Sequence, residues 1–176
     1  MKKAVFDEAE SKTRSFFKKA GIIIRNDESI EVADFGLDKL DKIGLQLCVY
    51  INTDRVCAKE MALFARQTCP EHKHIMTNGI PGKEETFRCR YGKVYLYVEG
   101  EGDRSGISAE IPETDVTVFH EIVLNAGEQY TIYPNTLHWF QAGPDGAVIS
   151  EFSTASTDET DVFTDSRIVR QTIIED

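Results

Sequence analysis

The sequence predicts an all-β barrel with an N-terminal helical extension, and three observations support this fold class. Short segments rich in β-forming residues recur from about residue 45 to residue 163. Turn-forming pairs separate these segments, among them Pro81-Gly82 and Ala126-Gly127. The first twenty residues instead carry apolar side chains at helical spacing. Many short strands at regular intervals are typical of an antiparallel sandwich or barrel.

The N-terminal segment has an apolar stripe that predicts one helix over about residues 1–20. Apolar residues every three or four positions favour a helix with one buried face, and Gly21 marks its end. Residues 22–25 favour a short strand. The stripe consists of Phe6, Ala9, Thr13, Phe16 and Phe17.

The barrel strands are expected where β-forming residues concentrate. They cover residues 45–52, 59–67, 86–89, 93–98, 117–124, 128–133, 139–142, 147–153 and 162–163. Residues 165–176 alternate in polarity and suit either a strand or a short helix. Because no linker, repeat or low-complexity stretch divides the chain, we expect one domain over residues 1–176. Its helical extension would cover residues 1–31 and its β-barrel residues 32–176.

Composition and charge exclude several classes of function. The 176 residues are 41% hydrophobic and 28% charged, and 30 acidic against 20 basic residues give a formal net charge of −10. An acidic surface repels phosphate backbones, so we expect no nucleic-acid partner. No apolar run approaches the ~18 residues of a membrane helix, and the N-terminus lacks the apolar core of a secretion signal. We therefore expect a cytoplasmic protein without membrane contact.

The cysteines are expected to be buried free thiols. Cys48, Cys57, Cys69 and Cys89 include no C-x-x-C pair. This spacing excludes a zinc ribbon and a thioredoxin-like motif. In a reducing compartment, a buried thiol behaves as a small apolar side chain.

Two histidines separated by one residue, His72 and His74, are the first sign of a metal site. On a strand, positions i and i+2 face the same side, so both imidazoles can reach one ion. Farther along, Glu85 stands seven residues before Gly92 and shares one strand face with apolar neighbours. We therefore expect Glu85 to point inward as a ligand, and Glu84 to point into solvent.

His138 completes the constellation, since it follows Gly127, a strand-like segment and Pro134. This order, together with His-x-His and the glutamate before a glycine, resembles the two motifs of the cupin family, which folds as a jelly-roll β-barrel. Three of the four histidines in the chain fall on motif positions. Three imidazoles and one carboxylate suit Mn²⁺, Fe²⁺, Co²⁺, Ni²⁺ or Zn²⁺ and leave coordination positions for a substrate.

Among cupins, the chain is similar to the cupin-type D-lyxose isomerases from about Val32 to its end. The similar segments are residues 31–37, 68–72, 82–92, 94–98, 128–132, 135–140 and 163–168. The resemblance implies a ketol isomerase that interconverts D-lyxose and D-xylulose, and often D-mannose and D-fructose. It also implies one manganese or similar ion and a homodimer. Two departures from the general cupin pattern are shared with this family: the ten-residue spacer between His74 and Glu85, and Thr136 in place of a glycine.

A ketol isomerase needs a base that moves a proton between C1 and C2 of an open-chain sugar. A metal-bound carboxylate is a poor base because the metal withdraws its electron density. Glu151 is our candidate, since it is the only charged residue in the apolar segment 146–152 and a buried carboxylate is costly unless it is used. Lys83 is the candidate donor to a sugar oxygen. Strand alternation also allows an outward Glu151, and Lys83 also suits a solvated loop position.

Several alternatives stay open at this point. His120 suits either a strand histidine bonded to a neighbour or a substrate contact, and Trp139 suits either the pocket wall or the core. The same four ligands fit a cupin dioxygenase that uses iron and O₂, and a sugar-binding cupin without catalysis. Metal identity and oxygen consumption separate the first from an isomerase, and turnover separates the second. The choice among sugar epimers depends on hydroxyl contacts that the sequence does not specify.

Overall fold

The computed structural model describes residues 1–175, which form mainly antiparallel strands behind an N-terminal helix, α1 (Lys3–Lys19). A 3₁₀ turn, η1 (Asp158–Thr160), lies near the C-terminal end. The expected all-β fold with an N-terminal helix is confirmed. The strands are β1 (Glu31–Ala33), β2 (Leu45–Asn52), β3 (Cys57–Leu63), β4 (Thr68–Lys73), β5 (Glu85–Val98), β6 (His120–Asn125), β7 (Gln129–Ile132), β8 (His138–Ser153) and β9 (Val162–Phe163).

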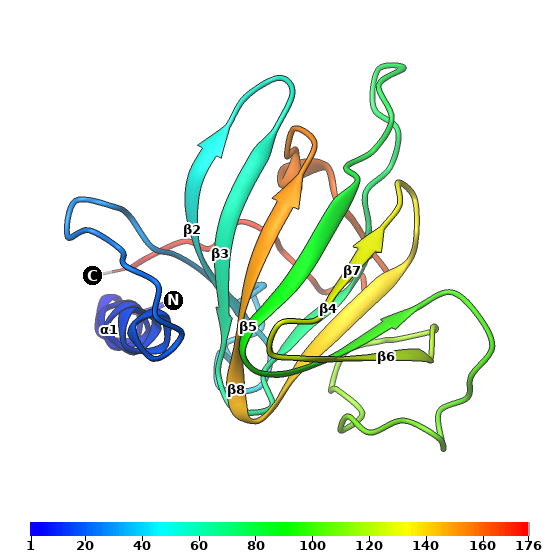
Figure 1. Ribbon diagram of the computed structural model, residues 1–176, viewed down its shortest axis with the longest axis horizontal. Coiled ribbons are helices and arrows are strands. Elements are labelled where there is room, and N and C mark those ends of the chain that lie inside the picture. Colours follow the sequence, from blue (N-terminus) through cyan, green and yellow to red (C-terminus); the bar gives the residue numbers. More distant parts are fainter. Residues whose placement is uncertain (176) are drawn as a thin grey trace.

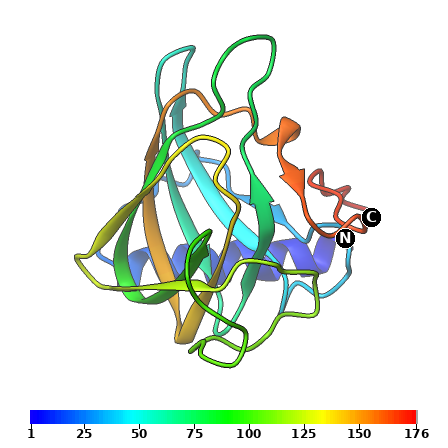
Figure 2. The same cartoon turned by 90° about the vertical axis from the view of Figure 1, so that its right-hand side faces the viewer.

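The strands form one curled sheet with the order β1-β2-β3-β8-β4-β9 (Figure 1 and Figure 2). β5 pairs with β6, β7 and β8. The two longest strands, β5 and β8, pair antiparallel along almost their whole length, from Glu85 opposite Ser153 to Val98 opposite His138. β8 also pairs with β3 at one end and with β4 at the other. β5 and β8 therefore connect β3 and β4 with β6 and β7, and the sheet curls around an interior core.

β5 and β8 are each one bent strand, whereas the sequence predicted two strands separated by a turn in each case. The expected breaks between the segments 86–89 and 93–98 and between the segments 139–142 and 147–153 are therefore wrong. Gly92 and Gly146 have φ values of +70° and +79°, in the left-handed region that favours glycine. A Cβ atom on Gly92 would lie 2.0 Å from the Gly146 carbonyl oxygen. The glycines thus let two paired backbones approach closely and bend together without ending.

Helix α1 covers the outer face of the curled sheet (Figure 1 and Figure 2). Its buried side chains include Ala9, Phe16 and Phe17, which pack with Val148 of β8. Burying a large apolar side chain stabilises the fold by about 1.5–3 kcal/mol, so this stripe fixes the helix on the sheet. Gly21 follows the end of the helix with a φ of +72°, which confirms the predicted stop. Within residues 1–175, no helix is long and apolar enough to cross a membrane.

Two expected elements do not form. Residues 22–25 make no strand, and residues 165–175 make only an isolated bridge between Lys2 and Glu175. The C-terminal segment is instead tied to the start of the chain, where the amino group of Met1 donates to the Ile173 carbonyl at 2.7 Å. Alternating polarity predicted a regular element, but side-chain and terminal contacts hold this segment. The expectation for residue 176 lies outside the described residues.

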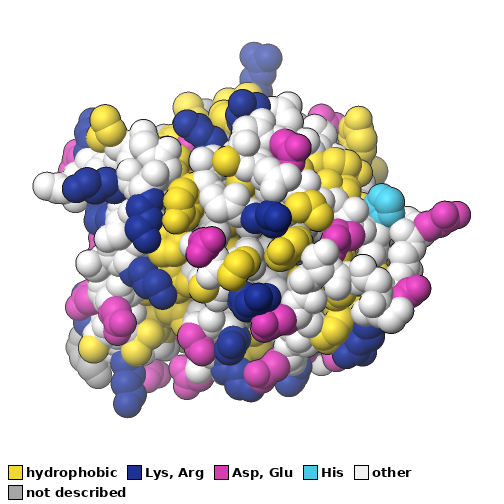
Figure 3. Space-filling model, turned by 60° about the horizontal axis from the view of Figure 1, so that its bottom comes forward, with side chains coloured by type: hydrophobic (Ala, Val, Ile, Leu, Met, Phe, Trp, Pro, Cys, Tyr) yellow, Lys and Arg dark blue, Asp and Glu magenta, His cyan; other side chains and the backbone are white. Residues whose placement is uncertain are grey.

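The thiols agree with the sequence expectation, whereas one face of the molecule carries both signs of charge. On the face shown in Figure 3, small apolar patches alternate with Lys, Arg, Asp and Glu side chains, so neither sign of charge dominates it. Cys48, Cys57, Cys69 and Cys89 are all buried and free.

Candidate metal centre and active site

Three buried histidines meet inside the barrel, and we call them the histidine cluster: His72, His74 and His138. His72 lies on β4 directly opposite His138, the first residue of β8. The ring centroid of His72 lies 4.3 Å from that of His138 and 5.0 Å from that of His74. One nitrogen from each ring lies within 4.8 Å of the other two. Three buried imidazoles at this spacing can bind one metal ion.

Hydrogen bonds at Nδ1 fix the orientation of all three rings. His72 Nδ1 donates to the Pro70 carbonyl at 2.8 Å, and His138 Nδ1 donates to the Thr136 carbonyl at 2.9 Å. His74 Nδ1 donates to Asp161 Oδ1 at 2.5 Å. A proton on Nδ1 leaves the Nε2 lone pair available to a metal.

His138 Nε2 shows most clearly that the site fits a metal ion. The atom is buried and makes no hydrogen bond of acceptable geometry in the part of the chain that the structure describes, although Glu85 Oε1 lies 3.1 Å away. A buried polar atom without a well-formed hydrogen bond is rare in proteins and often marks the place of an ion or water. Burial, followed by the neighbouring His138 and His74, lowers the pKa of His72 well below its usual range. His72 is therefore neutral, as a metal ligand must be.

Glu85, the first residue of β5, reaches the histidine cluster as predicted. Its Oε1 lies 3.2 Å from His74 Nε2 and 3.1 Å from His138 Nε2. Burial acts to raise the pKa of Glu85, but Lys83 and His74 outweigh it and hold the pKa well below its usual range. Glu84 is exposed on the opposite side of the chain, so the predicted orientations of both glutamates are confirmed.

Glu85 also favours a positive charge beside the histidine cluster. Burial acts to lower the pKa of His74, but Glu85 and the hydrogen bond that His74 donates to Asp161 outweigh it and raise the pKa to about 9. The two carboxylates that would hold a proton on His74 would equally attract a cation to the three rings. The donors of the histidine cluster and Glu85 together form the three-imidazole, one-carboxylate set that first-row divalent metals accept.

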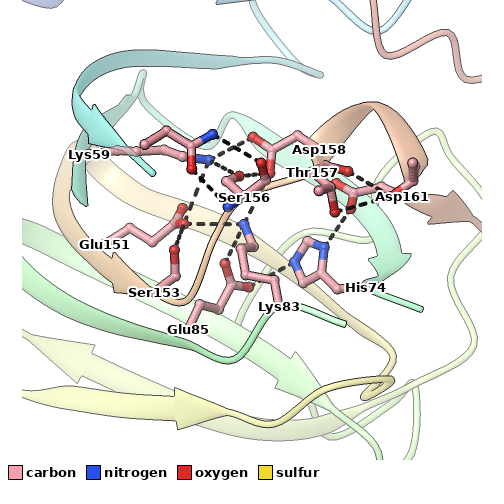
Figure 4. Close-up of polar contacts among 12 residues, drawn as sticks. Lys59, His74, Lys83, Glu85, Glu151, Ser153, Ser156, Thr157, Asp158 and Asp161 are labelled. Carbon is pink, nitrogen blue, oxygen red and sulfur yellow. Dashed lines mark hydrogen bonds and ion pairs between the residues drawn. The ribbon is translucent and has the colours of Figure 1, made fainter. Parts of the chain in front are cut away.

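Glu151 and Lys83, the predicted catalytic pair, lie together inside the barrel (Figure 4). Glu151 shares the interior face of β8 with Ile149, which settles the alternation that the sequence left open. Its Oε1 accepts hydrogen bonds from Lys83 Nζ and Ser153 Oγ, each at 3.1 Å. Lys83 Nζ also lies 2.8 Å from Glu85 Oε2, so it joins Glu151 to the metal centre.

Two further charged residues complete what we call the lysine cluster: Lys59, Lys83, Glu151 and Asp158. Lys59 Nζ lies 2.6 Å from Asp158 Oδ2 and 3.6 Å from Glu151 Oε1. Lys83 Nζ lies 3.2 Å from the other oxygen of Asp158. Burial acts to raise the pKa of Asp158, but Lys83 and Lys59 outweigh it and hold the pKa well below its usual range.

Sequence reasoning missed Lys59, Asp158 and Asp161. Lys59 had a usable signal, because it alternates with Cys57 and Met61 on the interior face of β3 and a lysine there needs a partner. Asp158 and Asp161 had none. They belong to an acidic loop in which Glu159, by contrast, is exposed.

A small cavity of about 30 Å³ lies between the two clusters. Its polar wall includes His72, Glu85, Lys83 and Glu151, and its apolar wall includes Phe87. Polar groups on one side and apolar side chains on the other suit a small polar substrate that is oriented by a few contacts.

His120 and Trp139 lie outside this cavity. His120 is exposed on β6, and its Nδ1 donates to the Glu101 carbonyl at 2.8 Å, which is the local role that the sequence allowed. Trp139 is fully buried and stacks on Tyr97 with ring centroids 4.1 Å apart. Its Nε1 donates to the Val118 carbonyl at 2.8 Å, so it is a core aromatic under the loop between β5 and β6.

Solved structures show the same fold. The L-ribose isomerase of Acinetobacter sp. DL28 matches with a TM-score of 0.74 at 17% identity, covering 99% of this chain and 98% of that one. An RmlC-like cupin from Shewanella frigidimarina matches with a TM-score of 0.53 at 13% identity, covering 78% and 92%. The predicted cupin barrel is therefore confirmed.

Sequence relatives identify the family. The D-lyxose/D-mannose isomerase of Thermosediminibacter oceani is 59% identical over 100% of this chain and 99% of its own length. The D-lyxose ketol-isomerase of Cohnella laeviribosi is 58% identical over 96% of this chain and 94% of its own. Residues 4–176 also match the family described as D-lyxose isomerase. With a buried histidine cluster, a cupin barrel and relatives that match along their whole length, this chain belongs to the D-lyxose isomerase family.

Proposed function

We propose that this protein is an aldose–ketose isomerase that interconverts D-lyxose and D-xylulose, and also D-mannose and D-fructose, through a cis-enediol. The names of its relatives support this activity. The observation that carries the proposal is Glu151, a buried carboxylate that stands apart from the histidine cluster and is joined to it through Lys83 and Glu85. A proton transfer between adjacent carbons needs such a separate base.

We propose that one divalent metal ion is held by the histidine cluster and Glu85. Mn²⁺ is the first choice, and Co²⁺, Zn²⁺, Ni²⁺ and Fe²⁺ are alternatives that the same donors accept. The buried His138 Nε2, which makes no hydrogen bond of acceptable geometry, and the three Nδ1–H bonds support this assignment. When bound, the ion supplies positive charge beside the two sugar oxygens on which the enediolate charge develops.

Glu151 takes the proton from C2 of the aldose and returns it to C1, and the ketose reacts in reverse. Its Oε1 is held by Lys83 and Ser153, while no hydrogen bond within residues 1–175 reaches Oε2. Oε2 is therefore the atom that takes the proton. Burial keeps water away from this carboxylate, of which 2% is exposed, so the proton passes back to carbon faster than it is lost.

Lys83 is the donor to a sugar oxygen. An ammonium group has three N–H donors, and those of Lys83 face Glu85, Glu151 and Asp158. Lys83 supplies a hydrogen bond to the sugar oxygen that gains charge in the enediol.

The test is a screen of aldoses with Mn²⁺-loaded protein, in which ketose formation is measured by proton NMR. We expect D-xylulose from D-lyxose and D-fructose from D-mannose. Oxygen consumption without ketose would indicate a dioxygenase, and saturable sugar binding without turnover would indicate a sugar-binding cupin. Either result would overturn the isomerase proposal.

We also propose a homodimer in the cytoplasm. Residues 49–51 of β2 and Phe152 of β8 present large exposed apolar side chains, and burying exposed apolar surface favours association. Light scattering at micromolar concentration should give twice the chain mass, and a single chain mass would contradict the dimer but not the activity.

A further inference from the structure

One short loop contacts both the histidine cluster and the lysine cluster. The loop between β8 and β9 contains η1 and carries Asp158 and Asp161, which are three residues apart. Asp161 points to His74, and Asp158 points to the two lysines (Figure 4). Glu159, between them in the sequence, is exposed. The loop thus presents two carboxylates to two different sets of partners.

Within residues 1–175, Asp161 is the only side chain that accepts a hydrogen bond from an Nδ1 atom of the histidine cluster. His72 and His138 donate from Nδ1 to backbone carbonyls two residues before them in the sequence. His74 lies just beyond the end of β4 and donates to Asp161 Oδ1 instead, at 2.5 Å. The two rings on strands are therefore fixed by local backbone, whereas the third depends on a carboxylate 87 positions away in the sequence.

Asp158 gives one oxygen to each lysine of the lysine cluster. Its Oδ2 accepts from Lys59 Nζ at 2.6 Å, and its Oδ1 accepts from Lys83 Nζ at 3.2 Å. Both ammonium groups also lie beside Oε1 of Glu151, at 3.6 Å and 3.1 Å. Without Asp158, both lysines would have Glu151 as a remaining anionic neighbour and would move toward it.

We propose that Asp161 and Asp158 are positioning residues, with Asp161 setting the metal affinity through His74 and Asp158 holding Lys59 and Lys83 at the distances that Glu151 needs. The proposal rests on the metal site and the isomerase activity proposed above. A carboxylate on the second nitrogen of a ligand histidine fixes its tautomer and raises its basicity. A carboxylate between two lysines keeps both from pairing more closely with the base.

Metal affinity tests the Asp161 part without any measurement of activity. Titration of metal-free protein with Mn²⁺ against a competing chelator gives the dissociation constant. We expect affinity to fall about 10-fold in Asp161→Asn, which can still accept the Nδ1–H bond, and towards about 100-fold in Asp161→Ala. Glu159→Gln removes the same charge from the same loop without touching His74, and it should stay within twofold of the parent.

Two results would overturn the Asp161 part. One is an affinity within twofold of the parent in both Asp161 variants, and the other is an equal loss in Glu159→Gln, which would indicate a general charge effect. Failure of the parent protein to bind Mn²⁺ is a different outcome, because it would remove the proposed metal site itself. If Asp161→Ala does not fold, the nearly isosteric Asp161→Asn decides.

Asp158→Asn tests the other part, because an amide oxygen can accept from one lysine but its NH₂ group faces the other. We expect unchanged Mn²⁺ affinity and a kcat about tenfold lower, with a smaller change in KM, whereas Glu159→Gln keeps the parent kcat. Loss of metal from Asp158→Asn, or a parent-like kcat with intact metal, would overturn the assignment of separate roles to the two aspartates.

Discussion

The histidine cluster and the lysine cluster lie side by side but are held in place by different forces. The rings of His72 and His138 are placed by strand register and by backbone carbonyls. The members of the lysine cluster come from β3, the segment before β5, β8 and η1, and they hold one another through charge. Removing the neutral ring of His72 leaves no unpaired charge, whereas removing one buried ion leaves its partners unpaired. Changes in the first cluster should therefore affect metal binding, and changes in the second should affect turnover and stability.

The largest expected effect is loss of the metal and of all activity when a ligand is removed. His72→Ala, His74→Ala and His138→Ala should each retain little bound metal by elemental analysis, with turnover at background. Chelation of the parent protein should have the same effect, and Mn²⁺ or Co²⁺ should restore activity. Full metal occupancy in His138→Ala would contradict the four-ligand assignment.

Adjacent glutamates provide a matched control for the same prediction. Glu85→Ala should lose the metal because its carboxylate lies about 3 Å from two ligand rings. Glu84→Ala should keep it, because Glu84 is exposed on the other side of the strand. Equal metal contents in the two variants would show that strand orientation does not decide ligation here.

Next in size is the effect of Glu151→Gln, which keeps the shape of the side chain and removes its basicity. Turnover should fall by about 10²–10⁴-fold, the usual contribution of a general base. Metal content should stay at the parent level, because Glu151 contacts Lys83 and Ser153 but no member of the histidine cluster. Steady-state kinetics and elemental analysis measure both quantities. An active variant would move the base to another residue.

Lys83→Met should have a smaller effect on turnover but a marked effect on stability. Lys83 pairs with three carboxylates and is 5% exposed, and breaking a buried pair costs about 3–5 kcal/mol. Urea denaturation of the metal-free protein measures this loss. Lys42→Met is the control, since Lys42 is exposed and should change the unfolding free energy by less than about 0.5 kcal/mol. Equal midpoints would show that charge does not hold the lysine cluster together.

The same contrast explains how far the sequence predicted the site. Strand alternation and motif spacing depend on neighbouring positions, so they located His72, Glu85 and the orientation of Glu84. The bends of β5 and β8 were missed because a glycine can either end a strand or let it bend. Which of the two occurs depends on the paired strand, and the sequence pattern does not show that pairing. Asp158 and Asp161 depend on contacts with residues more than 70 positions away. No local pattern separates them from the exposed Glu159 between them.

The final prediction concerns where the transferred hydrogen resides, and its effect is an isotope label without a change in rate. A base in the lysine cluster holds the hydrogen as a proton, which can exchange with water before it returns to carbon. A hydride shift passes hydrogen directly between C1 and C2 and admits no exchange. D-fructose or D-xylulose incubated with the enzyme in heavy water should therefore gain deuterium at C1, and the product aldose should gain it at C2. Proton NMR of the recovered sugars measures both positions. Burial of Glu151 should keep the label below one deuterium per turnover, but many turnovers should accumulate it. Sugars that remain unlabelled after many turnovers would rule out Glu151 as a proton carrier and would place the hydrogen transfer outside the lysine cluster.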